Sequence, residues 1–391
     1  MNGSKISFDD TAVAFGDKSD KALRLMYFLF CTMNYPLITK VGIWCTSTVL
    51  KLKLPVKGLI RKTLFFQFCG GESLEGCRTT IEKLKQSNIK AILDYSVEGE
   101  NTEEGFEANK LEMIRSLEYA ATSENIPITV MKLTAFIDFD LLIKAQSGLS
   151  FTENEKNKYI RFEKRVEAIC AKAVKHGKCL YIDAEESWIQ KAIDNVVYAM
   201  MRKFNKDKAY IFNTYQLYKK SALNDLTNAH QELRSMNCHL GAKLVRGAYM
   251  EKERERAEEM GYDDPIQPNK MACDRDYNLA LDYCIDHIDS ISVCAGTHNE
   301  DSSMHLAELI DSKGVDRADS RVFFAQLYGM SDNISYNLAK EGFNVAKYVP
   351  YGSVEKVMPY LMRRAEENTA IAGQTSREFL LVKKELKRRK G

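Results

Sequence analysis

The stretch KCLYIDAEESWIQKAIDNVVYAMMRKF, residues 178–204, contains the unit from which the fold can be predicted. It opens with an apolar, β-prone run, KCLYIDAE (178–185). It continues into SWIQKAIDNVVYAMMRKF, whose apolar residues recur at helical spacing. A short strand followed directly by an amphipathic helix is typical of a βα unit in a parallel sheet.

The same unit recurs along the chain, because eight β-prone runs are each followed by a charged, helical stretch. The runs are IKAILDYS (89–96), ITVMKLTAF (128–136), KCLYIDAE (178–185), AYIFNTYQ (209–216), HLGAKLVRG (239–247), SISVCAGTH (290–298), RVFFAQLYG (321–329) and FNVAKYVP (343–350). Eight successive βα units predict an α/β protein with a closed, TIM-like (β/α)8 barrel. A doubly wound open sheet is the alternative, but it usually has fewer strands, and its GxGxxG fingerprint is absent.

We expect three parts in the chain. Residues 1–69 form an N-terminal helical segment, residues 70–372 form the barrel with a last helix over its C-terminal face, and residues 373–391 form a basic helical tail. The segment LRLMYFLFCTM (23–33) suits either buried core or a membrane-facing helix, and we favour core. The tail, KKELKRRKG (383–391), is interpreted as a solvated helix end, with a contact to anionic lipid as the alternative.

The composition limits the class of protein. The 391 residues include 56 Lys and Arg against 54 Asp and Glu, a formal net charge of +2, which argues against nucleic acid as the main partner. The ten cysteines show no CxxC spacing and the six histidines are scattered, so we expect free thiols and no metal site.

The sequence also bears on location. No run reaches the 18 or so uninterrupted apolar residues that would predict a transmembrane helix. The N-terminus, MNGSKISFDDTAVAFGDKSD, has no signal pattern and carries acidic residues early, against a mitochondrial transit peptide. We therefore expect a cytoplasmic protein that is peripheral at the bacterial inner membrane, with a mitochondrial, inner-membrane-associated protein as the alternative.

Polar residues gather where the predicted strands end. The chemistry of such barrels sits at the carboxyl ends of the strands, and barrel stability does not require polar residues there. These ends carry Asp94, Glu98, Lys132, Asp183, Asn213, Gln216, Lys243, Arg246, Gly247, Tyr249, Thr297, His298, Asn299, Gln326, Leu327 and Tyr348.

The helix after the eighth strand contains PYLMRRAEENTA (359–370). Helical spacing puts Tyr360, Arg363, Arg364 and Glu367 on one face. Two adjacent guanidinium groups can clamp a carboxylate or phosphate through charge-assisted hydrogen bonds. Without a metal-ligand cluster or a nucleophile–base pair, redox chemistry through a bound organic cofactor becomes the favoured reading for a small acidic substrate.

At these residues the chain resembles the proline dehydrogenase family, flavin-dependent enzymes that begin proline degradation. The resemblance covers roughly residues 65–375 and is closest to the monofunctional, eukaryote-like branch, since 391 residues leave no room for an attached aldehyde dehydrogenase domain. The matching motifs are MKLTA (131–135), YIDAEE (181–186), FNTYQ (212–216), KLVRGAYM (243–250), GTHNED (296–301), AQLYGM (325–330), KYVPYG (347–352) and YLMRRAEEN (360–368).

The resemblance implies a reaction, the first step of proline catabolism. L-proline is oxidised to Δ1-pyrroline-5-carboxylate, a hydride passes to FAD, and the electrons then pass to a membrane quinone. It further implies that Arg363 and Arg364 bind the proline carboxylate. Lys132 would add positive charge there, and Asp183 would pair with this cationic cluster.

The resemblance implies further roles around the substrate. Glu98 would close the pocket by pairing with Arg363, and Glu367 matches the acidic residue of the last helix. The residues expected to lie against the pyrrolidine ring are Tyr249, Leu327, Tyr348 and Tyr360.

For the cofactor, the resemblance implies a set of FAD contacts that needs no GxGxxG motif. Two of them depart from many bacterial members, which have Gln where this chain has Asn213 and Arg where it has Lys243. Lys is a poorer bidentate donor than Arg, so the flavin geometry is in question at Lys243. The whole set is Asn213, Lys243, Val245, Gly247, Thr297, His298 and Asn299.

Two other functions stay open. A hydroxyproline dehydrogenase is the close alternative, but proline-specific members keep a tyrosine where Tyr348 stands, and this favours proline. A barrel that has lost catalysis and only binds a partner is the second, and the intact Arg363, Arg364, Lys132 and Asp183 argue against it.

Overall fold

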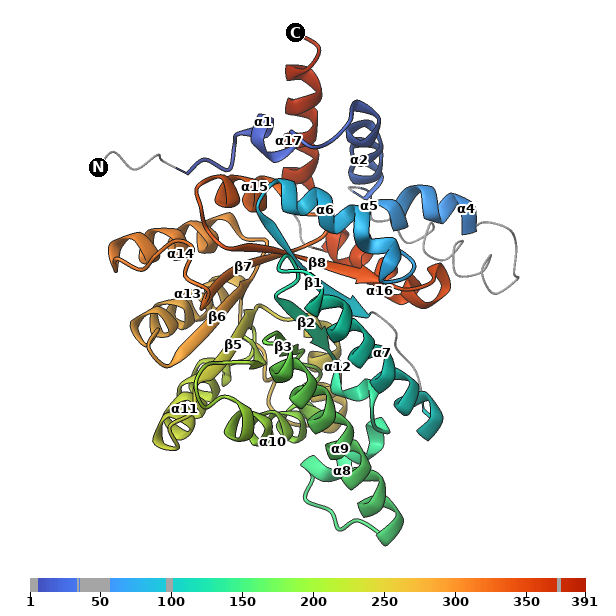
Figure 1. Ribbon diagram of the computed structural model, residues 1–391, viewed down its shortest axis with the longest axis vertical. Helices are drawn as coiled ribbons and strands as arrows, with labels where there is room; N and C mark the ends of the chain where they lie inside the picture. The colour runs from blue at the N-terminus through green and yellow to red at the C-terminus, as the bar shows by residue number, and fades with distance from the viewer. Residues whose placement is uncertain (1–5, 34, 36–56, 96–100, 371–373) are drawn as a thin grey trace. The chain divides into compact units, whose positions relative to one another are not determined.

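The computed structural model describes residues 6–33, 35, 57–95, 101–370 and 374–391. Eight parallel strands form a closed barrel in the order of the sequence (Figure 1). The prediction of a closed barrel is thus confirmed, and the alternative of an open sheet is wrong. The strands are β1 (Ile89–Tyr95), β2 (Ile128–Met131), β3 (Cys179–Ile182), β4 (Ile211–Gln216), β5 (Leu240–Val245), β6 (Ile291–Gly296), β7 (Val322–Leu327) and β8 (Val345–Tyr351).

Helices connect the strands and precede the barrel. Between β5 and β6 the chain forms two helices joined by an irregular loop, as the stretch MGYDDPIQPN (260–269) predicts. The helices are α1 (Thr11–Ala14), α2 (Asp20–Met33), α4 (Lys57–Ile60), η1 (Arg61–Phe65), α5 (Phe66–Phe68), η2 (Glu75–Cys77), α6 (Arg78–Gln86), α7 (Glu103–Ala121), η3 (Leu133–Ala135), α8 (Phe139–Gln146), α9 (Glu153–Lys175), α10 (Ser187–Phe204), α11 (Ala222–Ser235), α12 (Met250–Met260), α13 (Lys270–Asp286), α14 (Glu300–Ser312), α15 (Asp332–Lys340), α16 (Val354–Ala370) and α17 (Gln374–Arg388).

The strands are buried on both faces. Every residue of β4 and of β8 is buried, including polar residues such as Asn213 and Lys347. The sequences of such strands are almost continuously apolar, because helices cover one face of the sheet and side chains inside the barrel cover the other. β1 pairs in parallel with β8, in a register that runs from Ile89↔Val345 to Tyr95↔Tyr351.

The chain divides into two compact units, Met1–Val97 with Gln326–Gly391, and Glu98–Ala325. In the first unit, one apolar cluster contains Leu23, Met26 and Phe30 of α2, so one face of this segment is core as predicted, while Phe28 on the same helix is exposed. The same cluster contains Leu381 and Val382 of α17. The basic tail is therefore an amphipathic helix with a buried face, and not wholly solvated as expected.

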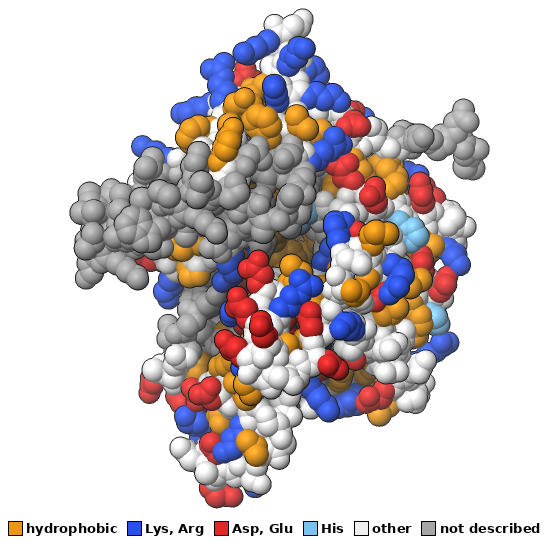
Figure 2. Space-filling model, turned by 180° about the vertical axis from the view of Figure 1, so that it is seen from behind, with side chains coloured by type: hydrophobic (Ala, Val, Ile, Leu, Met, Phe, Trp, Pro, Cys, Tyr) orange, Lys and Arg blue, Asp and Glu red, His pale blue; other side chains and the backbone are white. Residues whose placement is uncertain are grey.

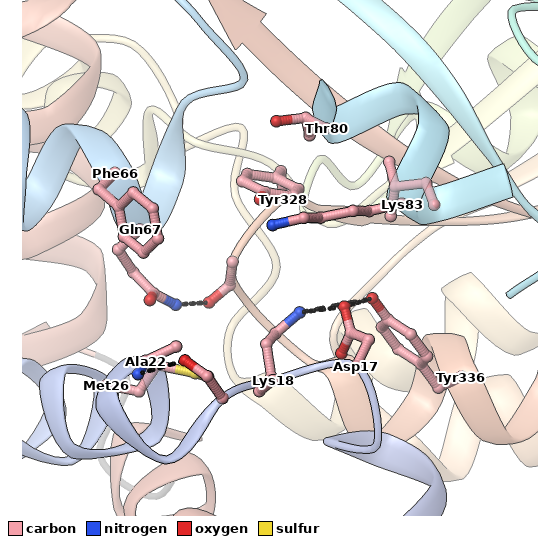
Figure 3. Close-up of a pocket in the computed structure, with 13 residues that line it drawn as sticks. Asp17, Lys18, Ala22, Met26, Phe66, Gln67, Thr80, Lys83, Tyr328 and Tyr336 are labelled. Carbon is pink, nitrogen blue, oxygen red and sulfur yellow. Dashed lines mark hydrogen bonds and ion pairs between the residues drawn. The ribbon is translucent and has the colours of Figure 1, made fainter. Parts of the chain in front are cut away.

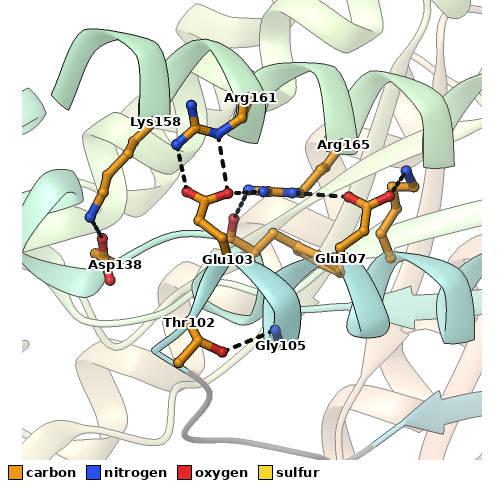
Figure 4. Close-up of polar contacts among 10 residues, drawn as sticks. Thr102, Glu103, Gly105, Glu107, Asp138, Lys158, Arg161 and Arg165 are labelled. Carbon is orange, nitrogen blue, oxygen red and sulfur yellow. Dashed lines mark hydrogen bonds and ion pairs between the residues drawn. The ribbon is translucent and has the colours of Figure 1, made fainter. Parts of the chain in front are cut away.

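In the second unit, a charged network joins α7 to α9 (Figure 4). The buried Arg165 guanidinium contacts both Glu103 and Glu107 and donates to the carbonyl of Phe136 at 3.2 Å. Arg161, one turn earlier on α9, also pairs with Glu103 at 3.0 Å. The network fixes α7 against α9, the two helices that lead into β2 and β3.

The surface mixes both signs of charge. Figure 2 shows basic and acidic side chains interspersed over the face drawn, in keeping with the small net charge of +2. Within the described part of the chain, every helix is too short or too polar to cross a membrane.

Candidate functional site

Lys132 follows β2 directly and contacts a tyrosine from the loop after β5. Its Nζ donates to the Tyr249 hydroxyl at 3.1 Å and lies 5.8 Å from the ring centroid. Burial raises the pKa of Tyr249, and the nearby Lys132 ammonium only partly offsets this. Tyr249 thus stays a neutral phenol that accepts from Lys132. The structure brings together these two residues, which the sequence placed in one site.

A buried carboxyl that the sequence analysis did not select lies close to this pair. Glu185, three residues after β3, accepts from the Thr134 hydroxyl at 2.7 Å and from its backbone N–H at 3.3 Å. Burial raises its pKa, against the opposing influence of Lys132. Glu185 lies in the motif YIDAEE, which the sequence analysis used. Its hydrogen-bond partner Thr134 is 51 residues earlier in the chain, so the sequence did not reveal the contact.

Asp183 and Lys243 form a short ion pair of 2.5 Å between the ends of β3 and β5. Lys243 is buried and Asp183 is partly exposed, so the ammonium is held in one position by its partner. The backbone N–H of Asp183 donates to Met131 at 2.9 Å, which fixes the carboxylate to the end of β2. Asp183 therefore pairs with Lys243, a residue that the sequence analysis expected to contact the cofactor.

Arg246 links β5 to β6 and to α13. Its guanidinium donates to the hydroxyls of Thr297 and Ser302 at 2.6 and 3.0 Å, and pairs with Asp274 at 2.7 Å. It also lies 4.5 Å over the ring of Tyr277. The planar guanidinium presents its N–H donors in fixed directions, and its hydrogen bond to the Thr297 hydroxyl orients that side chain. The sequence placed Arg246 at a strand end without a role, since its partners are distant in the chain.

The predicted cofactor residues after β6 begin α14. Thr297 is buried, and its hydroxyl accepts from the backbone N–H of Asn299 at 3.1 Å. Asn299 caps α14 by accepting from the Ser302 N–H at 2.8 Å. His298 stands between them and is half-buried. The three residues thus form one turn that Arg246 and the helix cap hold in place.

Asn213 has protein partners for both ends of its amide. Its Nδ2 donates to Asp194 on α10 at 2.8 Å, and its Oδ1 accepts from the Thr214 N–H at 3.0 Å. The side chain is fully buried. For this amide to contact a cofactor, one of these two hydrogen bonds would have to be replaced. The role of Asn213 as an FAD contact therefore stays a prediction.

The loop at Val245 and Gly247 lies against the end of β4. The Val245 carbonyl accepts from Leu217 at 2.8 Å, and the Arg246 carbonyl accepts from Tyr218 at 2.7 Å. Gly247 has φ +137°, and a Cβ there would lie 2.4 Å from the Tyr218 ring. Position 247 therefore requires glycine for both its backbone angle and its space.

In the first unit, α16 carries the arginine pair. Tyr360 is buried in the apolar cluster described above, and the Arg364 guanidinium lies 5.4 Å over its ring. Arg363 and Arg364 are half-buried. Pro359 stands inside α16, where it lacks the N–H that would bond one turn back. The expected sharing of a helix face by Tyr360 and the arginines is confirmed.

Leu327 and Tyr348 stand at neighbouring strands of the first unit. Tyr348 is buried, and its carbonyl accepts from the Tyr328 N–H at 2.8 Å, one residue beyond Leu327. Leu327 packs against the apolar cluster that contains Tyr360. Glu98 lies outside the described residues, as does the side chain of Glu367, although α16 includes that position.

A pocket of about 150 Å³ also lies in the first unit, apart from the predicted site residues (Figure 3). It is bordered by Lys18, Phe66, Lys83, Tyr328 and Tyr336 among others. Because no predicted site residue lines it, we do not assign the chemistry to it.

The described residues hold no group of three or more His, Cys, Asp or Glu side chains placed to bind a metal ion. What they present is a set of cations and hydroxyls: Lys132, Lys243, Arg246 and Thr297 in one unit, and Arg363 with Arg364 in the other. Such groups suit the binding of anionic ligands.

A family model described as proline dehydrogenase matches residues 77–377. The carbapenem antibiotics biosynthesis protein CarD of Pectobacterium carotovorum subsp. carotovorum is 34% identical over 369 residues, 94% of this chain and 95% of that protein. The mitochondrial proline dehydrogenase 1 of Dictyostelium discoideum is 31% identical over 436 residues, 100% of this chain and 76% of that protein. The hydroxyproline dehydrogenase of Xenopus laevis is 31% identical over 365 residues, 84% of this chain and 78% of that protein.

Among solved structures, proline utilization A (PutA) from Bdellovibrio bacteriovorus, inactivated by N-propargylglycine, superimposes with a TM-score of 0.73. The sequences are 18% identical, and the match covers 97% of this chain but only 41% of that chain. At this identity the likeness supports the fold alone.

Gly247→Ala should destabilise the protein, because the new methyl group meets the Tyr218 ring and the backbone angle disfavours any side chain. We expect a loss of about 2–4 kcal/mol, the sum of backbone strain and overpacking. Gly261→Ala is the matched control, since Gly261 has φ +71° but open space around it, and it should cost only about 1 kcal/mol. Urea unfolding of both variants measures the difference, and equal losses would contradict the role of Tyr218.

Proposed function

This chain belongs to the proline dehydrogenase family, and on that premise we propose that it oxidises L-proline to Δ1-pyrroline-5-carboxylate with FAD as hydride acceptor. The observation that supports this most directly is the arginine pair on α16, with Arg364 over the face of Tyr360. An amino acid with an apolar ring needs a cationic clamp for its carboxylate beside aromatic walls, and this helix offers both.

The residues present fit a flavin dinucleotide. Lys243 and Arg246 supply two cations for an anionic group, while Thr297 and His298 supply a hydroxyl and an imidazole. Gly247, which has no side chain, leaves the backbone open to close approach. When bound, FAD would accept the hydride from the ring carbon next to nitrogen. We propose Asn213, Val245 and Asn299 as the further contacts.

In this proposal Arg363 and Arg364 bind the proline carboxylate and so fix the ring for hydride transfer. Correct orientation of two reacting groups lowers the barrier by several kcal/mol, about 7–11 in the best intramolecular cases. The cation–π contact with Tyr360 restricts the Arg364 side chain before substrate arrives. Less freedom is then lost on binding.

Lys132 adds positive charge for the same substrate, and its hydrogen bond to Tyr249 orients both side chains. Asp183 acts through Lys243, whose ammonium it holds at 2.5 Å. Glu185 accepts from Thr134 through both of its oxygens and so keeps the turn after Lys132 in place.

Tyr348 and Leu327 are the proposed walls for the pyrrolidine ring. The likeness to the Xenopus laevis hydroxyproline dehydrogenase makes hydroxyproline the second candidate substrate. The bulk of Tyr348 favours proline, since a ring hydroxyl needs more room and a polar partner. Comparison of kcat/KM for the two substrates decides between them, and faster oxidation of hydroxyproline would overturn our choice.

We further propose that the reduced cofactor passes its electrons to a membrane quinone and that the protein is peripheral to the membrane. Phe28 on α2 and Leu380 on α17 are 60% and 56% exposed, and these helices pack together. Figure 2 shows basic side chains beside apolar ones at the top of the view, where Figure 1 places α17. The membrane is the bacterial inner membrane or, by likeness to relatives named mitochondrial, the mitochondrial inner membrane.

An absorbance spectrum of the purified protein, before and after anaerobic addition of L-proline, tests the proposed function. We expect a visible flavin band that bleaches with proline, because reduction removes the oxidised flavin. A flavin that stays oxidised with proline but bleaches with hydroxyproline would support the second candidate. A protein that binds no FAD when it is added would support a non-catalytic barrel.

Arg364→Met should raise KM for proline by about 10–100-fold and leave the FAD content unchanged, since one charge-assisted bond to a carboxylate is worth about 1.5–3 kcal/mol. Lys356→Met is the control, because Lys356 is an exposed cation on the same helix. Steady-state kinetics and the flavin-to-protein ratio measure both effects. Loss of FAD with unchanged KM would show that Arg364 serves the cofactor instead.

Binding to anionic vesicles tests the membrane contact. Lys383→Glu with Lys387→Glu should weaken co-sedimentation by roughly 10-fold or more, at about 1 kcal/mol for each cation near an anionic surface. Both lysines are exposed on α17. The same reversal at Lys85 and Lys175, exposed on α6 and α9, should have little effect. If both double variants lost vesicle binding equally, the binding would depend on the net charge of the protein and not on the basic residues of α17.

A further inference from the structure

The first unit contains a group of buried charges outside the proposed substrate contacts. Lys347 of β8 is fully buried, and its ammonium pairs with Asp332, at the start of α15, at 2.8 Å. Asp332 also pairs with Lys18 at 3.3 Å, and Lys18 lies beside Asp17 and Tyr336 (Figure 3). Burial raises the pKa of Asp332, but the two ammonium groups outweigh it and hold the pKa below its ordinary value.

This group holds the loop of residues 328–331, which joins β7 to α15. Lys347 donates to the Met330 carbonyl at 2.5 Å, and Gln67 donates to the Gly329 carbonyl at 2.7 Å. A Cβ at Gly329 would lie 2.0 Å from the Gln67 carbonyl oxygen, so the loop is packed without spare room. Ser331 has φ +49°, an angle that a residue with a side chain keeps only under external constraint.

The constraint on Ser331 comes from the C-terminal helix. Glu378 of α17 is 3% exposed, and its Oε1 accepts from the Ser331 N–H. Its Oε2 has no hydrogen-bond partner among the described residues. The charged groups that face it are Asp332 from α15 and Lys347 from β8. One oxygen of this carboxyl therefore holds the loop, and the other is buried without a donor.

The loop that Glu378 holds begins directly after Leu327 and is bonded to Tyr348. The Tyr328 N–H donates to the Tyr348 carbonyl, and Lys347, bonded to Met330, precedes Tyr348 in β8. Successive residues of a strand point to opposite faces, so Lys347 and Tyr348 share one backbone but face different surroundings. A shift of the loop would move both proposed walls of the substrate ring.

We propose that Glu378 is a positioning residue for the substrate wall, which ties α17 to the 328–331 loop and does so best while its carboxyl is protonated. The consequence for substrate rests on the proposed function, whereas the contact itself does not. Neutral Glu378 keeps its Oε1 acceptor for Ser331 and places no charge in the buried site. The hydrogen bond from Ser331 is by itself stronger to a carboxylate, but the cost of burying the charge beside Asp332 outweighs this gain. Ionised Glu378 would place a second negative charge beside Asp332, on an oxygen that lacks a donor.

The direction of the pH dependence follows from the same surroundings. Burial and then Asp332 raise the pKa of Glu378 to about 7, above its ordinary value of 4.5. Between these two values the folded state holds a proton that the unfolded state has released. The stabilising contact is therefore strongest at the acid end of this window, weakens as the pH rises through it, and reaches a constant low level above about pH 7.

Hydrogen exchange of the Ser331 amide, measured without substrate and corrected for the intrinsic rate, tests the proposal. In the wild-type protein, protection should fall about 10-fold from about pH 6 to about pH 8, since one pKa unit corresponds to a tenfold change. Glu378→Gln, which keeps an oxygen acceptor but cannot ionise, should show similar protection at both pH values. Glu378→Ala should show low protection at both.

Glu385→Gln is the matched control on the same helix. Glu385 is also buried but pairs with Arg388 and Arg389, so this variant should keep the wild-type pH dependence at Ser331. If Glu378→Gln also keeps it, Glu378 is not the responsible group and the proposal fails.

Steady-state kinetics test whether Glu378 positions Leu327 and Tyr348, the proposed walls of the substrate ring. Glu378→Ala should raise KM for proline about 3–10-fold with unchanged FAD content, and Glu378→Gln should restore KM, most fully at the alkaline end. A fall in kcat alone, or no rescue by Gln, would indicate a merely structural role. If the wild-type protein does not oxidise proline, the proposed function fails while the exchange result stands.

Discussion

The pairing of β1 with β8 is the constraint on which the first unit depends. Seven residues near position 90 align in parallel with seven near position 348, and this pairing closes the barrel. Because the strands are parallel, their carboxyl ends meet side by side, and the chain leaves β8 towards α16. The position of the arginine pair on that helix therefore depends on a strand whose partner, β1, comes from much earlier in the sequence.

The two units solve the problem of buried charge differently. In Glu98–Ala325, ion pairs such as Asp183–Lys243 join neighbouring strand ends, and hydroxyls such as that of Thr297 occupy the remaining donors. In the other unit, Lys347 is a buried cation within an all-buried strand. Its ammonium contacts the Asp332 carboxylate, which also pairs with Lys18, and the Met330 carbonyl. A buried cation without such partners would be costly, so this group specifies where β8, α15 and the loop of residues 328–331 can lie.

The sequence was sufficient for the barrel, since strand and helix periodicities alternate eight times, and for the helix face with Tyr360, Arg363 and Arg364. These features depend on local spacing. It was not sufficient for Glu185, Arg246 or Glu378, whose partners lie 28 to 56 residues away along the chain, although Glu185 and Arg246 stand inside recognised motifs. Glu378 was hidden further, because a basic amphipathic helix at the end of a chain resembles a solvated tail, and only the packing of Leu381 and Val382 shows its buried face. For Asn213 the reverse holds: a motif suggested a ligand contact where the structure gives Asp194 and Thr214 as partners.

The division of the first unit between the two ends of the sequence has a consequence for the order of events at the ribosome. Residues 98–325 form one continuous unit, so the contacts within it become available once residue 325 has been synthesised. The other unit has to wait for its second half. Arg389 contacts the carbonyl of Phe15 and the carboxylate of Asp20, and Lys384 contacts Asp9, so the last residues made dock onto the first. Until then Leu23, Met26 and Phe30 of α2 lack the apolar partners that α16 and α17 supply.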